Sequence, residues 1–242
     1  MQTLAIVNVV GSTIAREADH VFYTLAGPEI AVATTKAYST QLAAGYLLAI
    51  KLAEIRGTAE PERISALVEE LGTLPGKIER TLEDKERIQW FAAKFANARD
   101  VFFIGRGIDY AVSMEGSLKL KEISYLHSEA YAAGELKHGT ISLIEEGTLC
   151  VGSVTQPLLF EKTVSNMVEV KSRGGYLMGL TMYGNYSMED TADFTVYIPK
   201  TDPAFATSVA IVPLQLFAYY LAVAKGLDVD KPRNLAKSVT VE

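Results

Sequence analysis

The sequence predicts an α/β protein with a mostly parallel sheet: one complete three-layer unit, preceded by only the rear part of an earlier copy. Three observations predict this fold. Apolar, β-rich runs alternate with helical patterns from residue 100 onward, a shorter series of the same kind occupies residues 3–56, and the two series match each other. The 242 residues, 49% of them hydrophobic and 21% charged, are typical of a globular protein with ample core.

The first series begins with an almost wholly apolar run at residues 3–10, which is typical of a strand buried on both faces. A short second strand is expected at residues 21–24. A long helical pattern then covers residues 34–56 and ends at Gly57, a residue that commonly closes helices.

A helical connector is expected next. Residues 61–71 and 77–98 have amphipathic patterns, and Pro75-Gly76 between them predicts a break. The domains expected from these patterns are residues 1–75, 76–225 and 226–242.

The second series is longer and complete. Its first strand leads into a Gly105-Arg106-Gly107 turn, and alternation of strands with helices predicts parallel pairing. The expected strands are residues 101–104, 128–133, 149–154, 176–182 and 194–198, and the expected helices are residues 110–126, 158–172 and 204–225.

An internal repeat relates the two series. Ala18-Asp19, Tyr23 and the run 41–47 match Ala192-Asp193, Tyr197 and the run 215–221, each 174 positions further on. Only Met1 to Glu17 precede the first match, so the front of the first copy is expected to lie before Met1. The chain is then an excised fragment, or another chain supplies the strands. The alternative is an accidental repeat with Met1 as the true start.

Composition excludes several classes of protein. A net charge of −6 argues against general nucleic-acid binding, and no signal peptide or membrane-spanning run is evident. The single cysteine, Cys150, lies in an apolar run and is expected to be a buried, inert thiol. A cytoplasmic protein is therefore expected, and since no residues have metal-ligand spacing, neither a metal nor another cofactor is expected.

Glu115, Lys119 and Glu122 share one face of the helix predicted at residues 110–126. Charged residues at this spacing usually form a solvated ladder of ion pairs. However, this helix follows a glycine turn at the carboxyl end of a strand, where open α/β sheets bind ligands. Apolar neighbours, Met114 and Leu118 among them, predict a covered helix. The face could then supply a carboxylate base.

Two further residues have side chains suited to proton transfer or nucleophilic attack. His138 lies in a polar loop, residues 134–140, and can exchange protons near neutral pH. Lys237, in the tail, could capture a carbonyl group if a cleft lowered its pKa. By spacing alone, an incidental surface histidine is the favoured interpretation of His138, and a lysine in a tail is normally solvated.

Together these segments resemble a known family. Residues 115–125, 131–139 and 232–242 are similar to the isomerase half of the glutamine–fructose-6-phosphate aminotransferase (glucosamine-6-phosphate synthase) family. That half contains two sugar-isomerase (SIS) domains of flavodoxin-like fold, in agreement with the repeat, and the resemblance covers essentially the whole chain. It implies fructose 6-phosphate and glucosamine 6-phosphate as ligands, a homodimer, and a glutaminase domain in the full-length enzyme.

The resemblance also implies roles for individual residues. His138 would open the sugar ring, in the active site of a neighbouring subunit. Lys237 would form a Schiff base with the open ketose, and Glu122 would move a proton between C2 and C1 with the help of Lys119 and Glu115. Three further residues match positions at or beside the sugar pocket: Val32, Thr34 and Ala236.

The sequence departs from the family in one respect that matters for activity. The serine-rich loop that cradles the sugar phosphate would lie before Met1, as would the glutaminase half. The chain alone is therefore expected to turn over sugar phosphate weakly or not at all. The alternatives are an SIS-type module that senses a sugar phosphate without reacting, and a fold that pairs with itself through exposed strand edges.

Overall fold

The computed structural model describes residues 1–236, and the chain divides into two compact units. Unit 1 contains Met1–Gly72 and the residues from Asn234 onward, and unit 2 contains Thr73–Arg233. The strands are β1 (Leu4–Val7), β2 (His20–Tyr23), β3 (Asp100–Gly105), β4 (His127–Ala132), β5 (Leu149–Val154), β6 (Tyr176–Met182) and β7 (Phe194–Ile198). The α-helices are α1 (Thr13–Glu17), α2 (Thr35–Arg56), α3 (Pro61–Leu82), α4 (Lys85–Lys94), α5 (Ile108–Ser124), α6 (Phe160–Lys171) and α7 (Ala206–Ala224).

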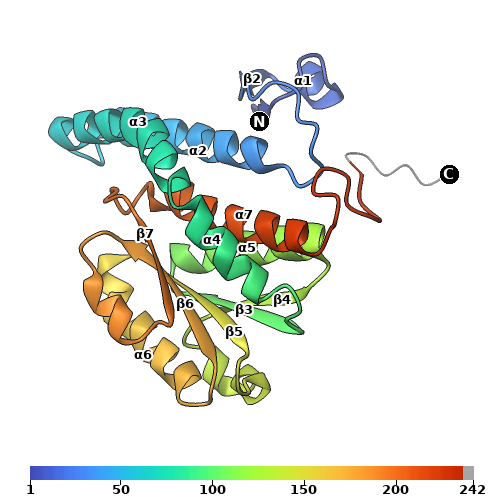
Figure 1. The fold of residues 1–242 in the computed structure, drawn as a ribbon. Coiled ribbons are helices and arrows are strands. Elements are labelled where there is room, and N and C mark those ends of the chain that lie inside the picture. Colours follow the sequence, from blue (N-terminus) through green and yellow to red (C-terminus); the bar gives the residue numbers. More distant parts are fainter. Residues whose placement is uncertain (237–242) are drawn as a thin grey trace. The chain divides into compact units, whose positions relative to one another are not determined.

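Unit 2 is a three-layer α/β structure. Its five strands are all parallel and have the order β4-β3-β5-β6-β7. Helices α4, α5 and α7 cover one face of this sheet and α6 covers the other (Figure 1). The central strands are buried on both faces, and every residue of β5 is buried, because helices cover them from both sides. The predicted α/β fold with a parallel sheet is therefore confirmed.

Helix α5 packs closely against α7 and β3. A Cβ atom at Gly116 would lie 2.6 Å from Leu214 Cδ1 and 3.3 Å from Phe103 Cε1, so only glycine allows this approach without rearrangement. Small residues on the same face, Ser113 and Ser117, are also buried. The buried face of the helix thus combines small residues with the apolar side chains of Val112, Leu120 and Ile123.

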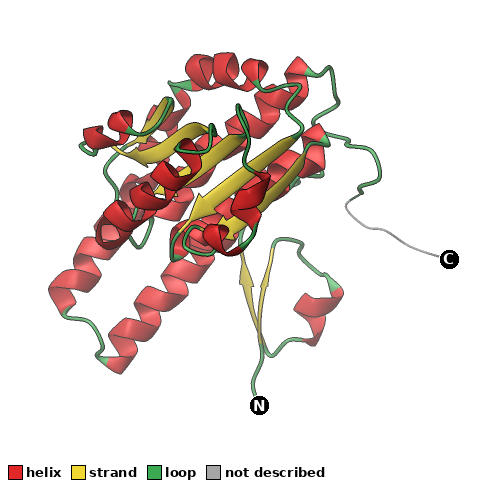
Figure 2. Ribbon diagram, turned by 90° about the horizontal axis from the view of Figure 1, so that it is seen from below, coloured by secondary structure: helices red, strands yellow, loops and turns green. Residues whose placement is uncertain are grey.

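Unit 1 contains a two-stranded parallel sheet, β1-β2, followed by the long helix α2. Figure 2 shows these two short strands and the five strands of unit 2 as separate sheets. The strand predicted at residues 3–10 ends at Val7, and the short helix α1, which the sequence did not predict, follows it.

The repeat seen in the sequence is also present in the backbone. Leu4 pairs with His20 in unit 1, and the residues 174 positions further on, Met178 and Phe194, pair in the same register in unit 2. An aspartate closes each pair in the same way: Asp19 Oδ2 accepts a hydrogen bond from the N–H of Thr3, and Asp193 Oδ2 accepts one from Leu177, both at 2.8 Å. The strand pair β1-β2 of unit 1 is thus equivalent to β6-β7, the last two strands of the five-stranded sheet.

One predicted boundary is wrong. The sequence predicted a break at Pro75-Gly76, but α3 continues through both residues and ends at Leu82. Proline in a helix interior removes one hydrogen bond and costs roughly 3 kcal/mol. The amphipathic character of α3, which buries Leu74 and Thr81, offsets that loss. The break comes instead at Glu83-Asp84, before α4.

Candidate active site

Helix α5 starts directly beyond the carboxyl end of β3. The turn between them is tight: a Cβ atom at Gly105 would lie 2.5 Å from the carbonyl carbon and oxygen of Asp109, and Gly107 has a φ of +58°. Both positions favour glycine, because a side chain would clash at the first and be strained at the second. The predicted glycine turn therefore places the start of α5 at the carboxyl end of β3, the edge at which open α/β sheets generally bind ligands.

Glu115, Lys119 and Glu122 form an ion cluster on one face of α5. Lys119 Nζ lies 2.7 Å from Glu122 Oε2 and 3.5 Å from Glu115 Oε1. The three side chains are 6%, 22% and 15% exposed, in the order Lys119, Glu122, Glu115, so the cluster is not a solvated ladder. A buried ammonium group requires such partners, because an isolated charge would be costly to remove from water.

The two carboxylates of this cluster differ. Burial raises the pKa of Glu115, and the charge of Glu122 raises it further, against the lowering effect of Lys119. Glu122 Oε2 is buried and, apart from the ion pair, has no hydrogen-bond partner in the described chain. Glu122 is thus a carboxylate with unused accepting capacity, which is what a proton acceptor requires.

The neighbouring apolar residues are not where the sequence predicted them. Met114 and Leu118, expected to be covered, are 45% and 40% exposed, whereas Ile123 is buried. The helix buries Val112 and Leu120 together with its small residues, as described above. The burial of the ion cluster therefore does not depend on those two side chains.

A buried aspartate lies at the point where the strand order reverses, between β3 and β5. Asp109 is 1% exposed and accepts three hydrogen bonds, from Thr155 N at 2.7 Å, Thr155 Oγ1 at 2.5 Å and Gln156 N at 3.3 Å. Open α/β sheets bind ligands at such switch points. In unit 2 the donors that could hold a ligand's anionic group there are instead used by the protein's own carboxylate.

The loop that carries His138 is anchored at its start and leaves the histidine exposed. Leu136 is buried, and the guanidinium of Arg106 packs against Gly134 while donating to Asn166 Oδ1 at 3.1 and 2.9 Å. His138 is exposed, and within the described chain its side chain has no hydrogen bond or ion pair to the cluster on α5. Unit 2 alone does not bring His138 together with Glu122.

In unit 1, Val32 and Thr34 precede α2. The hydroxyl of Thr34 donates to the carbonyl of Val32 at 2.7 Å, and Thr34 has a left-handed φ of 59°. Thr34 also lines a hollow of about 650 Å³ with residues that follow β1 and β2. The two expected pocket residues therefore lie beside each other at the carboxyl end of the short sheet.

The chain end leaves unit 2 beside the end of α5. The hydroxyl of Tyr125 accepts a hydrogen bond from Arg233 N at 2.7 Å, and the Arg233 guanidinium lies 4.2 Å from the centroid of the Tyr125 ring. Ala236 is exposed. Lys237 lies outside the described residues. The tail thus contacts Tyr125, the residue that caps the end of α5, three residues after Glu122.

The sequence analysis missed three of these residues: Arg106, Asp109 and Tyr125. Arg106 stands between two glycines at the end of β3, and this was an available signal. The partners of Asp109 and Tyr125 are distant in sequence, so no local pattern indicated them.

Other predictions concern cysteine, metal and membrane. Cys150 is fully buried, so the prediction of a buried thiol is confirmed, and burial raises the pKa of this thiol to about 12. Within residues 1–236 no cluster of three or more histidine, cysteine or acidic side chains could hold a metal ion. One described helix, α7, is long and apolar enough to span a membrane, but most of it is buried in unit 2, as in a core helix.

The parallel sheets and the repeated strand pair define an α/β protein built from two copies of one fold. The sequence profile of the SIS domain matches residues 1–51 and 94–225, that is, both parts of the repeat. The chain belongs to the SIS domain family.

Curated relatives specify the resemblance further. The chain is 58% identical to glutamine–fructose-6-phosphate aminotransferase [isomerizing] of Caldanaerobacter subterraneus subsp. tengcongensis and 56% identical to that of Clostridium tetani, over its whole length. It spans 40% of the length of each. The C-terminal domain of glucosamine-fructose-6-phosphate aminotransferase from Francisella tularensis has the same fold, with a TM-score of 0.90 and 36% identity over 95% of this chain and 65% of that one. The predicted family resemblance is thus confirmed.

Proposed function

We propose that this chain carries the ketose–aldose isomerase chemistry of an enzyme that makes glucosamine 6-phosphate from fructose 6-phosphate and glutamine. The observation that supports it most is the buried cluster on α5, in which Lys119 lies between Glu115 and Glu122. Isomerisation needs a positioned carboxylate that removes a proton next to a carbonyl or imine carbon, and Glu122 has the required burial and free accepting capacity.

The roles of the other residues follow from the chemistry. Lys237 adds to the C2 carbonyl of the open ketose and forms an imine with loss of water. Ammonia from glutamine then replaces the lysine nitrogen at C2, which frees Lys237 and leaves the imine that is isomerised. Glu122 takes a proton from C1 and returns it to C2, while the ammonium group of Lys119 offsets the negative charge of the carboxylates beside it. Glu115, whose pKa is raised, assists as a hydrogen-bond donor when protonated. His138 opens the sugar ring by acid–base catalysis.

The exposure of His138 supports an active site completed by a second subunit. Its side chain has no partner within the described chain, so it is available to a neighbouring molecule. We therefore include a homodimer in the proposal. A glutaminase domain, in accord with glutamine in the name of the relatives, and a cytoplasmic location are also part of it. Val32, Thr34 and Ala236 would line the sugar pocket. Residues 1–75, 76–225 and 226–242 would be the rear part of a first SIS domain, a second SIS domain and an active-site tail.

The test uses a chimaera in which the N-terminal part of the Caldanaerobacter relative precedes this chain. Fructose 6-phosphate and borohydride are added, and the modified lysine is located by mass spectrometry. We expect reduction to attach the sugar to Lys237, and a Lys237→Ala variant to lose turnover but keep sugar-phosphate binding. A variant that keeps its turnover would favour a sensing module over an enzyme.

A further inference from the structure

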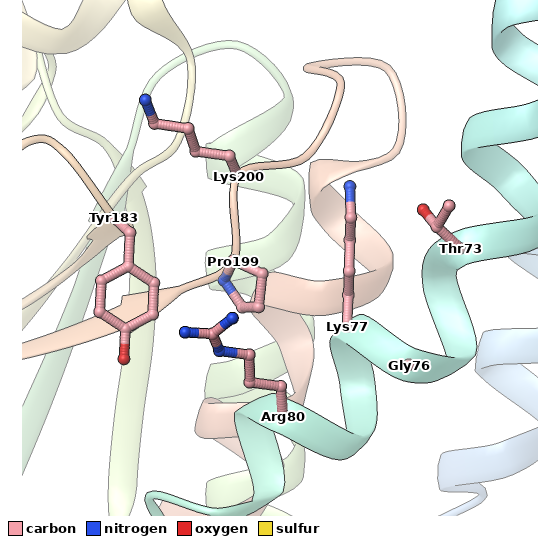
Figure 3. A pocket seen from close by; sticks show the side chains of 7 residues that line it. All are labelled: Thr73, Gly76, Lys77, Arg80, Tyr183, Pro199 and Lys200. Atoms are coloured by element: carbon pink, nitrogen blue, oxygen red, sulfur yellow. The ribbon is translucent and has the colours of Figure 1, made fainter.

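Arg106 is packed into unit 2 in a way that other cations of this unit are not. In the hollow between α3 and the ends of β6 and β7, the Lys200 amine and the Tyr183 hydroxyl point away from the Arg80 guanidinium (Figure 3). Both cations there are exposed, as long charged side chains normally are. Arg106 is instead half-buried, and its guanidinium lies between two other segments of the chain.

One of these segments is the start of the loop that carries His138. A Cβ atom at Gly134 would lie 2.7 Å from Arg106 Nη2 and 3.2 Å from its Cζ, so the guanidinium lies directly against the backbone. A side chain at position 134 would displace it. Two residues further on, Leu136 is 1% exposed and belongs to the hydrophobic core. The loop is therefore fixed at two points before it reaches His138.

The other segment is helix α6, through Asn166. This residue is 4% exposed, and its Oδ1 accepts hydrogen bonds from Arg106 Nε at 3.1 Å and from Nη2 at 2.9 Å. Two donors of one planar group on one acceptor fix the orientation of the guanidinium. Within the described chain Arg106 has no carboxylate at ion-pair distance, so its position does not depend on a salt bridge.

Beyond this anchor the loop leaves the backbone of His138 little freedom. It consists of two consecutive 3₁₀ helices, η1 (Leu136–His138) and η2 (Thr140–Leu143), and the N–H of His138 donates to the carbonyl of Glu135 at 3.0 Å. The side chain of His138 is exposed at the end of η1. An acid–base group that acts on a sugar held by another subunit has to be presented in one place, because misplacement by about 1 Å can cost about 100-fold in rate.

We propose that Arg106 is a positioning residue for His138. Together with Gly134 and Asn166 it fixes the loop, so that the imidazole is presented to the sugar ring. This inference rests on the proposed function, in which His138 opens the ring of fructose 6-phosphate. Arg106 itself does not touch the reacting atoms. Its loss should therefore slow ring opening and leave the later steps unchanged.

A substrate without a ring separates positioning from a general loss of fold. 5-Deoxyfructose 6-phosphate lacks the hydroxyl group that closes the furanose ring, so its ketone is always open. Amino sugar phosphate formed from glutamine by the chimaera described above measures kcat with each substrate. Arg106→Met should lower kcat by about tenfold or more with fructose 6-phosphate, and by less than about twofold with the deoxy substrate. His138→Asn should show the same dependence on the substrate.

Three further variants complete this test. Asn166→Ala removes the acceptor and should behave like Arg106→Met, whereas Asn166→Asp keeps an acceptor oxygen and should keep the parent rate. The double variant Arg106→Met/Asn166→Ala should be no slower than either single variant, because both changes remove the same contact. Arg99→Met, at an exposed arginine, is the control and should change neither rate.

Amide hydrogen exchange of this chain examines the loop without any turnover. Arg106→Met should speed exchange at the His138 amide by about tenfold or more and leave the amides of α7 unchanged. Equal slowing with both substrates, the parent rates in Arg106→Met, or unchanged exchange at His138 would overturn the inference and leave the isomerase proposal in place. A parent chimaera that converts neither substrate would overturn both.

Discussion

Lys119 shows how one side chain turns a common surface pattern into a candidate site. Its ammonium group is buried and lies within 4 Å of two carboxylates, so each charge depends on the others. Removal of one partner from a buried ion pair typically costs about 3–5 kcal/mol, because it leaves a charge uncompensated. The helical spacing predicted that the three residues share a face. Their burial could not be predicted from it, because it depends on how closely Gly116 lets α5 approach α7 and β3.

Tyr125 holds the start of the tail, and a substitution tests this contact. Tyr125→Leu removes both the hydrogen bond to Arg233 and the stacking beneath its guanidinium. Each contact contributes about 1 kcal/mol, so trypsin should cleave after Arg233 roughly tenfold or more faster in the variant. Mass spectrometry of timed digests measures this rate. Tyr186→Leu, at an exposed tyrosine, is the control, and an equal rate in all three proteins would show that Tyr125 does not hold the tail.

Asp109 predicts a pH dependence of stability. Burial raises the pKa of this carboxyl above its ordinary value, so the folded protein binds the proton more readily than the unfolded chain. The stabilising contribution is therefore complete below the ordinary pKa, about 4, and is lost as pH rises through the folded pKa. Since Asp109→Asn cannot titrate, the parent chain should lose free energy of unfolding relative to this variant as pH rises from about 4.

Urea unfolding at a series of pH values measures that difference. Asp190→Asn, at an exposed aspartate, serves as the control and should show no comparable trend. A constant difference between the parent chain and Asp109→Asn across the acid range would contradict the assignment of a raised pKa to Asp109.

Helix α5 owes its position to a glycine at its interface with α7. The sequence predicted the helix within two residues at each end, because its apolar periodicity and the glycine turn are local signals. The continuation of α3 through Pro75 was not predicted, because the packing that offsets the proline is tertiary. The type of each element was thus largely predictable from the sequence. Whether a proline or glycine ends a helix, as at Pro75-Gly76, was not.

Two glycines in unit 2 should respond oppositely to alanine. At Gly116 a Cβ atom would lie 2.6 Å from Leu214 Cδ1, so Gly116→Ala should destabilise unit 2 by about 1–3 kcal/mol. At Gly76, within α3, a Cβ atom would meet nothing within 4 Å, so Gly76→Ala should stabilise it by about 0.5–1 kcal/mol. Chemical denaturation measures both changes. If Gly116→Ala left the free energy of unfolding unchanged, α5 and α7 could move apart without cost and the account of this interface would be wrong.

At the scale of the whole molecule, the repeat was the most informative sequence feature. A match 174 positions apart predicted that residues 1–56 repeat the end of the later unit, and the equal registers of β1-β2 and β6-β7 agree with it. The candidate site was only partly predictable. The proposed residues belong to different units, and Lys237 lies outside the described residues, so spacing could suggest each residue by itself but not whether they form one site.

The central claim is that Glu122 moves a proton between C1 and C2 of a ketose phosphate. Hydrogen exchange at C1 of fructose 6-phosphate in deuterated water, followed by NMR with the chimaera described above, tests it most directly. Glu122→Gln should slow this exchange by about 100-fold or more while sugar-phosphate affinity stays within twofold, and Glu129→Gln should change neither. Exchange by Glu122→Gln at the parent rate would contradict the account.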